Sequence, residues 1–239
     1  MIVKDYTTPY WNDLLDQLAS DLDRAKLLAW IDEESAGFPQ ALGAVTEVGI
    51  FCIDMQDGGK YGGTTDTLHT NFCASASSQQ RVRDLTDDEE QLQVTCGVAM
   101  VRDYLSTAQS QLSRSSLSWD DDDTWCLVKL RHALPTIGAN ILPAAAQNEQ
   151  AADWGTFRAY CEAMSVETMS SLVNIPTATL TSRKYWPMDR FFVNAERVGY
   201  ADGAGLVSSS GGLSTLGKAI VSIAILVGIL YYGGRSGLV

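Results

Sequence analysis

Apolar and polar residues alternate with the period of an α-helix along most of the chain up to residue 198. The pattern predicts helices over residues 10–19, about 21–35, 86–112, 124–134, 137–147, 153–165 and 166–173. Asp21 or Asp23 can cap the second of these, and Thr86 with Glu89 three residues later has the character of a capping box. Four aromatic residues between 183 and 198 can close the core: Tyr185, Trp186, Phe191 and Phe192. We therefore expect a mainly α-helical fold.

The helical period breaks between residues 36 and 85. The Ala-Gly-Phe-Pro sequence of residues 36–39 ends the second helix, and residues 45–55 form a short apolar stretch that is expected to be a strand or an extended turn. A loop rich in Gly, Thr and Ser follows over residues 56–78. The expected domain, residues 1–198, thus combines many helices with one short irregular β segment.

Glu34 differs from the other acidic residues because it falls on the apolar side of a predicted helix. It lies three residues after Ile31 and seven after Leu27, which form the apolar stripe of the second helix together with Leu28. Glu33 is one position round the helix and is expected to be more exposed. A carboxyl group that is partly removed from water keeps its proton to higher pH, as the general acid of glycoside hydrolysis must. The alternative is a surface glutamate near the end of a helix.

The segment after this helix completes a pattern. Glu34-Ser35 is followed by a loop and then by Gly49-Ile50-Phe51-Cys52-Ile53. This arrangement resembles the active-site motif of lysozymes and lytic transglycosylases, in which Glu-Ser at a helix end precedes Gly-hydrophobic-hydrophobic-Gln-hydrophobic. The resemblance implies a lysozyme-like fold that cleaves the glycan strands of peptidoglycan, with Glu34 as the acid and with four residues at the substrate: Ser35, Gly49, Ile50 and Phe51. It is specific over about residues 10–60, extends to 85–165 only as an expectation of further helices, and says nothing of residues 166–239.

Two positions depart from the family pattern. Cys52 stands where the family has glutamine, which removes an amide group from the expected cleft. Glu47 lies two residues before Gly49, where animal-type lysozymes carry a second carboxylate. With Glu47 in the cleft, the resemblance implies a retaining hydrolase with two carboxylates. With Glu47 turned to solvent, Glu34 acts alone and the substrate's own hydroxyl attacks, which gives the anhydro-sugar product of a transglycosylase; we favour this version.

Composition excludes some classes of ligand. The chain has 239 residues and a formal net charge of −12, and it shows no basic face for nucleic acid. Its five cysteines, an odd number without a CxxC pair, suggest buried free thiols, with a Cys52–Cys73 bridge as the alternative. His69 and His132 are too isolated for a metal site, and the four aspartates of residues 120–123 lack the spacing of a calcium loop and are expected to cap the next helix. No metal or other cofactor is predicted.

The composition changes beyond residue 198. Residues 199–217 are dominated by Gly, Ser and Ala, as in a flexible linker. Residues 219–234 carry no charge and are flanked by Lys218 and Arg235, which predicts a membrane helix over residues 218–235. The alternative is a helix buried in a protein assembly. The N-terminus lacks the apolar segment and the cleavage site of a signal peptide.

These features together favour one class of protein. We expect a virion-associated peptidoglycan-degrading enzyme of a bacteriophage, a lytic transglycosylase or muramidase that opens the wall locally during genome entry. Its tail would reach a membrane of the host envelope, and its partners would include other virion proteins. One alternative is a virion structural or ejection protein that keeps the lysozyme fold without activity, which Cys52 favours. Another is a cellular tail-anchored enzyme that faces the cytoplasm.

Overall fold

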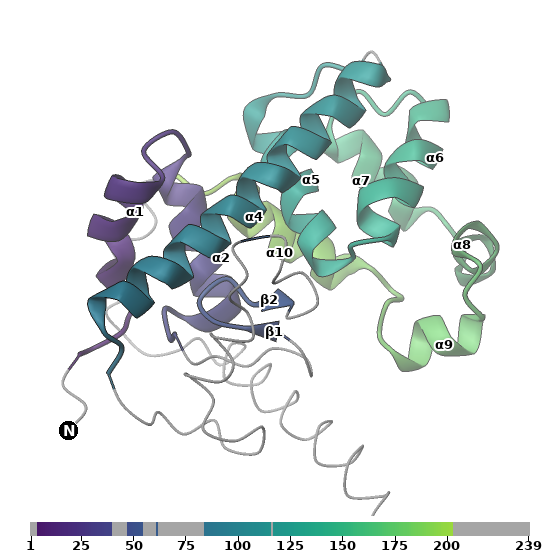
Figure 1. Ribbon diagram of the computed structural model, residues 1–239. Helices are drawn as coiled ribbons and strands as arrows, with labels where there is room; N and C mark the ends of the chain where they lie inside the picture. Colours follow the sequence, from purple (N-terminus) through teal and green to yellow (C-terminus); the bar gives the residue numbers. More distant parts are fainter. Residues whose placement is uncertain (1–3, 40–46, 55–60, 62–83, 116, 203–239) are drawn as a thin grey trace, which may run out of the picture. The chain divides into compact units, whose positions relative to one another are not determined.

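The computed structural model describes residues 4–39, 47–54, 61, 84–115 and 117–202. These residues fold into a succession of helices and one short β-hairpin, which confirms the predicted mainly α class for this part of the chain (Figure 1). They divide into two compact units, the first within residues 1–99 and the second within residues 100–202. The long helix α4, Asp87–Arg114, contributes its first part to one unit and the rest to the other.

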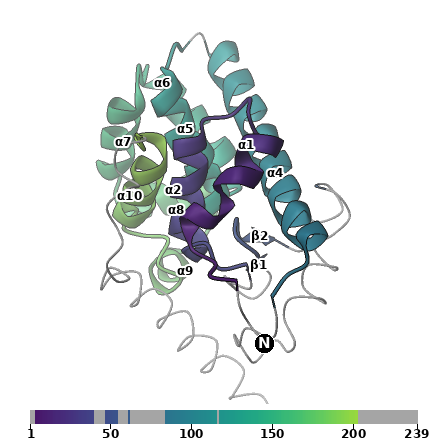
Figure 2. The ribbon, with the colours of Figure 1, turned by 90° about the vertical axis from the view of Figure 1, so that its left-hand side faces the viewer.

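The first unit contains the N-terminal helices and the hairpin. Besides the start of α4, its elements are the 3-10 helix η1 (Thr8–Trp11), α1 (Asn12–Leu18), α2 (Arg24–Ser35), β1 (Glu47–Val48) and β2 (Ile53–Asp54). The two strands pair antiparallel, and the turn of residues 49–52 joins them. The predicted β segment is therefore a minimal hairpin, and it lies beside the C-terminal end of α2 (Figure 2).

The ends of the helices in this unit follow the local sequence signals. Asp23, the second of the two candidate caps, accepts hydrogen bonds from the second and third amides of α2. Ala36 ends that helix in a left-handed conformation. At the start of α4 the capping box is complete: the Thr86 amide donates to Glu89 Oε2 at 2.8 Å, and the Glu89 amide donates to Thr86 Oγ1 at 3.3 Å.

Large apolar side chains fill the space between α2, the hairpin and α4. Trp30 and Ile31 of α2 are fully buried, and the ring centroid of Trp30 lies 6.5 Å from that of Phe51 in the hairpin turn. Gly97 of α4 faces the same ring, because a Cβ at this position would lie 2.0 Å from Phe51 Cδ2. A side chain at residue 97 would therefore displace the hairpin turn from the helix.

The regular elements in the described residues of the second unit are all helices. After the second part of α4, its elements are α5 (Asp121–Ala133), the π-helical turn η3 (Ile137–Ile141), α6 (Leu142–Asn148), α7 (Trp154–Glu162), α8 (Val166–Val173), α9 (Thr177–Ser182) and α10 (Asp189–Gly199). The predicted helices over residues 124–134, 137–147, 153–165 and 166–173 correspond to α5 through α8. The short α9 was not predicted, because its Thr-rich sequence has little helical periodicity.

Helix α10 packs directly on α5. A Cβ on Gly199 would lie 2.2 Å from Cys126 Sγ and 2.8 Å from the Asp122 carbonyl oxygen, so only glycine permits this approach. Phe192 of α10 meets Trp154 and Phe157 of α7 at ring-centroid distances of 5.8 and 6.4 Å. Of the four aromatic residues expected to close the core, the two on α10, Phe191 and Phe192, are buried, and the two in the preceding turn are half-buried.

The cysteines of the described residues are buried free thiols: Cys52, Cys96, Cys126 and Cys161. This confirms the predicted state for these four and excludes a bridge from Cys52 in this structure. Burial raises the pKa of the Cys161 thiol to about 12, which keeps it protonated and unreactive near neutral pH. Cys73 lies outside the described residues.

Helix lengths and compositions also bear on the membrane prediction. Within the part of the chain that the structure describes, no helix is both long and apolar enough to cross a bilayer. α4 has sufficient length, but it begins with four acidic residues. The predicted helix over residues 218–235, and the predicted linker beyond residue 202, lie outside the described residues.

Candidate active site

The last turn of α2 is joined to the hairpin turn by a serine hydroxyl. Ser35 Oγ lies 2.9 Å from the carbonyl oxygen of Ile31 in its own helix and 3.0 Å from the carbonyl oxygen of Ile50. The same hydroxyl accepts a hydrogen bond from the Gly37 amide at 3.2 Å. The two halves of the sequence motif, Glu34-Ser35 and the segment that starts at Gly49, are therefore in contact.

The hairpin turn itself requires unusual backbone conformations. Gly49 has φ +84°, which suits glycine. Cys52 has φ +47° although it carries a side chain, and its amide donates to the Gly49 carbonyl at 3.1 Å. Its thiol lies 3.5 Å from the backbone carbonyl oxygen of Glu34, as donor to that oxygen. Cys52 thus faces the end of α2 and is only 2% exposed.

A glutamine from α4 holds the turn from the other side. Gln93 is buried, its Oε1 accepts a hydrogen bond from the Ile50 amide at 3.1 Å, and its Nε2 donates to the Pro39 carbonyl at 2.8 Å. A Cβ on Gly49 would lie 3.1 Å from the same Oε1. Gln93 therefore fixes both the turn and the chain that leaves α2.

Gln93 was missed by sequence reasoning, although a signal was present. Cys96, Gly97 and Met100 follow it at spacings of three, four and seven residues. Gln93 therefore belongs to the inward stripe of α4. A polar residue on a buried stripe needs a partner of its own. The partners lie 43 and 54 residues away in sequence, so the sequence did not identify them.

The predicted acid is at the end of α2, where the motif places it. Glu34 and Glu33 are both half-buried. Glu47 is half-buried in β1, where it pairs with Asp54 of β2. Among the predicted substrate residues, Ile50 and Phe51 are each 1% exposed. Their side chains pack in the core, so a ligand at this turn would meet its backbone.

Glu90, a buried carboxylate in the first unit, is surrounded by hydrogen-bond donors. Glu90 accepts hydrogen bonds from Tyr6 Oη at 2.7 Å, from Tyr10 Oη at 3.0 Å and from Lys4 Nζ at 2.8 Å. Burial, followed by the hydrogen bond to Glu90, raises the pKa of Tyr6 and that of Tyr10 above their usual value. Glu90 is thus a fully satisfied acceptor that ties the N-terminal segment to α4, which indicates a structural role.

The acidic run at the start of α5 is also structural. Asp120 caps the helix by accepting the Asp123 amide at 2.8 Å, as predicted. Asp123 accepts the Trp154 amide at 3.0 Å and the Tyr200 hydroxyl at 2.8 Å. Its hydrogen bonds therefore serve to attach α7 and the end of α10 to α5.

No family model, no curated protein and no solved structure matches the chain. The likeness to lysozymes and lytic transglycosylases therefore depends on the motif residues alone.

We predict that Gln93→Leu destabilises the protein. The substitution keeps the volume but leaves the Ile50 amide and the Pro39 carbonyl without their partner, and each buried unsatisfied group costs about 1–3 kcal/mol. The free energy of unfolding, measured with urea, should fall by about 2–4 kcal/mol. Gln91→Leu, on the exposed side of the same helix, is the control and should change stability by less than about 0.5 kcal/mol. Equal stabilities of the two variants would contradict the role assigned to Gln93.

Proposed function

We propose that this chain is a virion-associated enzyme of a bacteriophage that cleaves the glycan strands of peptidoglycan, as a lytic transglycosylase or a lysozyme-type muramidase. Glu34 is the general acid, which protonates the glycosidic oxygen as the bond to the sugar breaks. The backbone of residues 49–52 forms the adjoining wall of the substrate site. The reaction needs no metal or cofactor.

One observation carries this proposal. The Ser35 hydroxyl lies within hydrogen-bonding distance of the Ile31 carbonyl of its own helix and of the Ile50 carbonyl, so the glutamate-bearing turn of α2 is close to the glycine-containing hairpin turn. Gln93, a buried side chain of α4, accepts a hydrogen bond from the Ile50 amide, so the hairpin turn is also attached to a second helix. Such preorganisation is what a general acid needs in order to meet one oxygen of a bound sugar. The half-buried position of Glu34 is compatible with this use.

The second candidate is a lysozyme-fold structural or ejection protein without activity. Cys52 favours it, because the thiol is turned to the Glu34 backbone and is buried. At this position the chain offers no side-chain amide to a sugar. Such a protein would still bind peptidoglycan through the turn, but it would not cleave it.

We predict that Glu34→Gln abolishes wall cleavage by the full-length chain. The amide keeps the shape of the side chain but cannot give up a proton, so the rate of release of soluble glycan should fall about 100-fold or more. Glu33→Gln is the matched control and should stay within about twofold of the wild-type rate. Circular dichroism should show both variants folded.

Two results would reject the assignment. An active wild type whose Glu34→Gln variant retains nearly full activity would exclude Glu34 as the acid. A wild type that sediments with purified walls and releases no glycan would support the inactive alternative.

A separate prediction concerns Glu47 and the product. In the single-acid version that we favour, Glu47→Ala keeps activity within about tenfold of wild type, since no step requires a second carboxylate. Mass spectrometry of the released glycan should then find 1,6-anhydro ends. Products with only reducing ends, together with an inactive Glu47→Ala variant and an inactive Glu47→Gln variant, would identify a hydrolase with two carboxylates.

The tail is the second part of the proposal. We propose that residues 218–235 insert in a host membrane, and that the Gly/Ser-rich segment before them lets the enzyme reach the wall. Support comes from the sequence: between Lys218 and Arg235 the run has no charged residue, and Tyr231 and Tyr232 suit the headgroup region.

We predict that full-length protein floats with liposomes and that Ile225→Arg greatly reduces the floating fraction. A charge at the centre of a membrane helix costs about 2.5–3.5 kcal/mol. The control is Leu238→Arg, which replaces an apolar residue beyond the flanking Arg235 and should leave flotation unchanged. If the wild type stays in solution and forms oligomers that Ile225→Arg disperses, the apolar run is an assembly interface instead.

A further inference from the structure

Helix α10 of the second unit has a buried apolar face and an exposed basic face. The buried face packs in the core through Phe191, Phe192, Ala195, Val198 and Gly199. Arg190 and Arg197 are exposed and lie seven residues apart on the other face, about 10 Å from each other along the helix axis. Val193 lies between them and is 47% exposed. The helix therefore presents two arginines and one apolar side chain in a single row.

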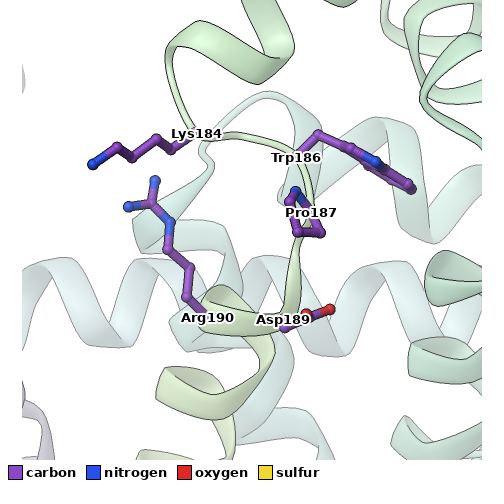
Figure 3. Close-up of a pocket in the computed structure, with 5 residues that line it drawn as sticks. All are labelled: Lys184, Trp186, Pro187, Asp189 and Arg190. Carbon is purple, nitrogen blue, oxygen red and sulfur yellow. The ribbon is translucent and has the colours of Figure 1, made fainter.

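Two neighbouring side chains extend this row. Lys184, in the turn before the helix, extends to the same side as Arg190, with the two charged ends directed toward one another (Figure 3). Tyr200, seven residues after Val193, is 48% exposed. Val193 and Tyr200 are two of the three large hydrophobic side chains that are exposed among the described residues. The α10 surface is formed by these five residues: Lys184, Arg190, Val193, Arg197 and Tyr200.

The acidic residues of α10 and of the segment after it leave this surface positively charged. Figure 3 shows that Asp189 extends to the opposite side of the turn from the cations. Glu196 is half-buried and accepts hydrogen bonds from Arg158 Nη1 at 2.6 Å, so its charge is paired within the protein. Asp202 follows the helix and offsets one of the three cations. The α10 surface is therefore basic in a chain whose formal net charge is −12.

The chain between α10 and the predicted membrane segment is short. Residues 203–217 separate the last described residue from residues 218–235. A Gly/Ser-rich chain of this length spans about 20 Å on average. If the tail inserts as proposed above, the end of α10 is held at about this distance from the bilayer surface. A tether of this length gives an effective concentration in the millimolar range, at which a weak contact is sufficient.

We propose that the α10 surface docks on the anionic lipid headgroups of the membrane that holds the tail; this contact rests on the tail part of the proposed function. Each Lys or Arg near an anionic bilayer strengthens binding about fivefold. The net charge of the chain opposes binding, but charges farther away than a Debye length of about 8 Å are largely screened at physiological salt. The local cations therefore decide the attraction. Val193 and Tyr200 lie beside the cations and enter the headgroup region, where apolar and tyrosine side chains are favourable.

The test measures flotation of the full-length chain with two kinds of vesicle. One consists of phosphatidylcholine, and the other contains about 30% phosphatidylglycerol in addition. The measured quantity is the ratio of the two binding constants, to which the cations that flank the tail also contribute. Lys184→Gln, Arg190→Gln and Arg197→Gln together should lower this ratio about tenfold or more. Salt at about 1 M should lower the wild-type ratio in the same way.

Two control variants separate charge from other effects. Arg190→Lys together with Arg197→Lys keeps both charges and should keep the ratio. Arg114→Gln removes an exposed arginine at the end of α4, outside the α10 surface, and should leave the ratio within about twofold of wild type. Circular dichroism should show that every variant is folded.

The outcomes distinguish the α10 surface from the tail. An unchanged ratio in the triple Gln variant would overturn the proposal, as would loss of the preference in the double Lys variant. A wild type that does not float with phosphatidylcholine vesicles would reject insertion of the tail. Anionic vesicles still test the α10 surface in that case: binding that the triple Gln variant loses supports it, and the absence of binding overturns it.

Discussion

The buried amide of Gln93 links segments of the first unit that are remote in sequence. Its oxygen holds the hairpin turn at Ile50, and its nitrogen holds the chain at Pro39, just after α2. A turn of four residues between two-residue strands has little stability of its own. The position of this turn against α2 therefore depends on α4, through Gln93 and through the contact of Gly97 with Phe51.

The position of Cys52 is compatible with the support that the turn receives from α4. Cys52 packs against the Glu34 carbonyl and lies in the core, whereas the amide that holds the turn comes from α4. The turn is thus supported by a residue outside the segment that resembles the lysozyme motif. Residue 52 offers no side-chain amide to a ligand. The amide that supports the turn is that of Gln93.

Local signals in the sequence predicted local structure well. The cap at Asp23, the capping box of Thr86 and Glu89 and the aspartate cap of α5 were all anticipated, because each depends on residues within three positions of one another. The contact of Glu34-Ser35 with the glycine turn was anticipated only through a family resemblance. The Gln93 contacts and the Glu90 cluster were not anticipated, since their partners are set by how the helices pack. A helical pattern likewise does not show how closely neighbouring elements cover each face, and Glu33 is half-buried as Glu34 is.

The Glu90 cluster has a consequence for the order in which the first unit folds. Tyr6 and Tyr10 leave the ribosome early, yet the carboxylate that accepts their hydroxyls follows 84 and 80 residues later. Contacts of such long sequence separation form late, because the intervening chain must close first at a cost in entropy. Until α4 has emerged, these tyrosines and the core beneath them have no partner from that helix. The nascent first unit therefore remains incomplete through most of its synthesis. Its N-terminal segment binds to α4 only after Glu90 has been made.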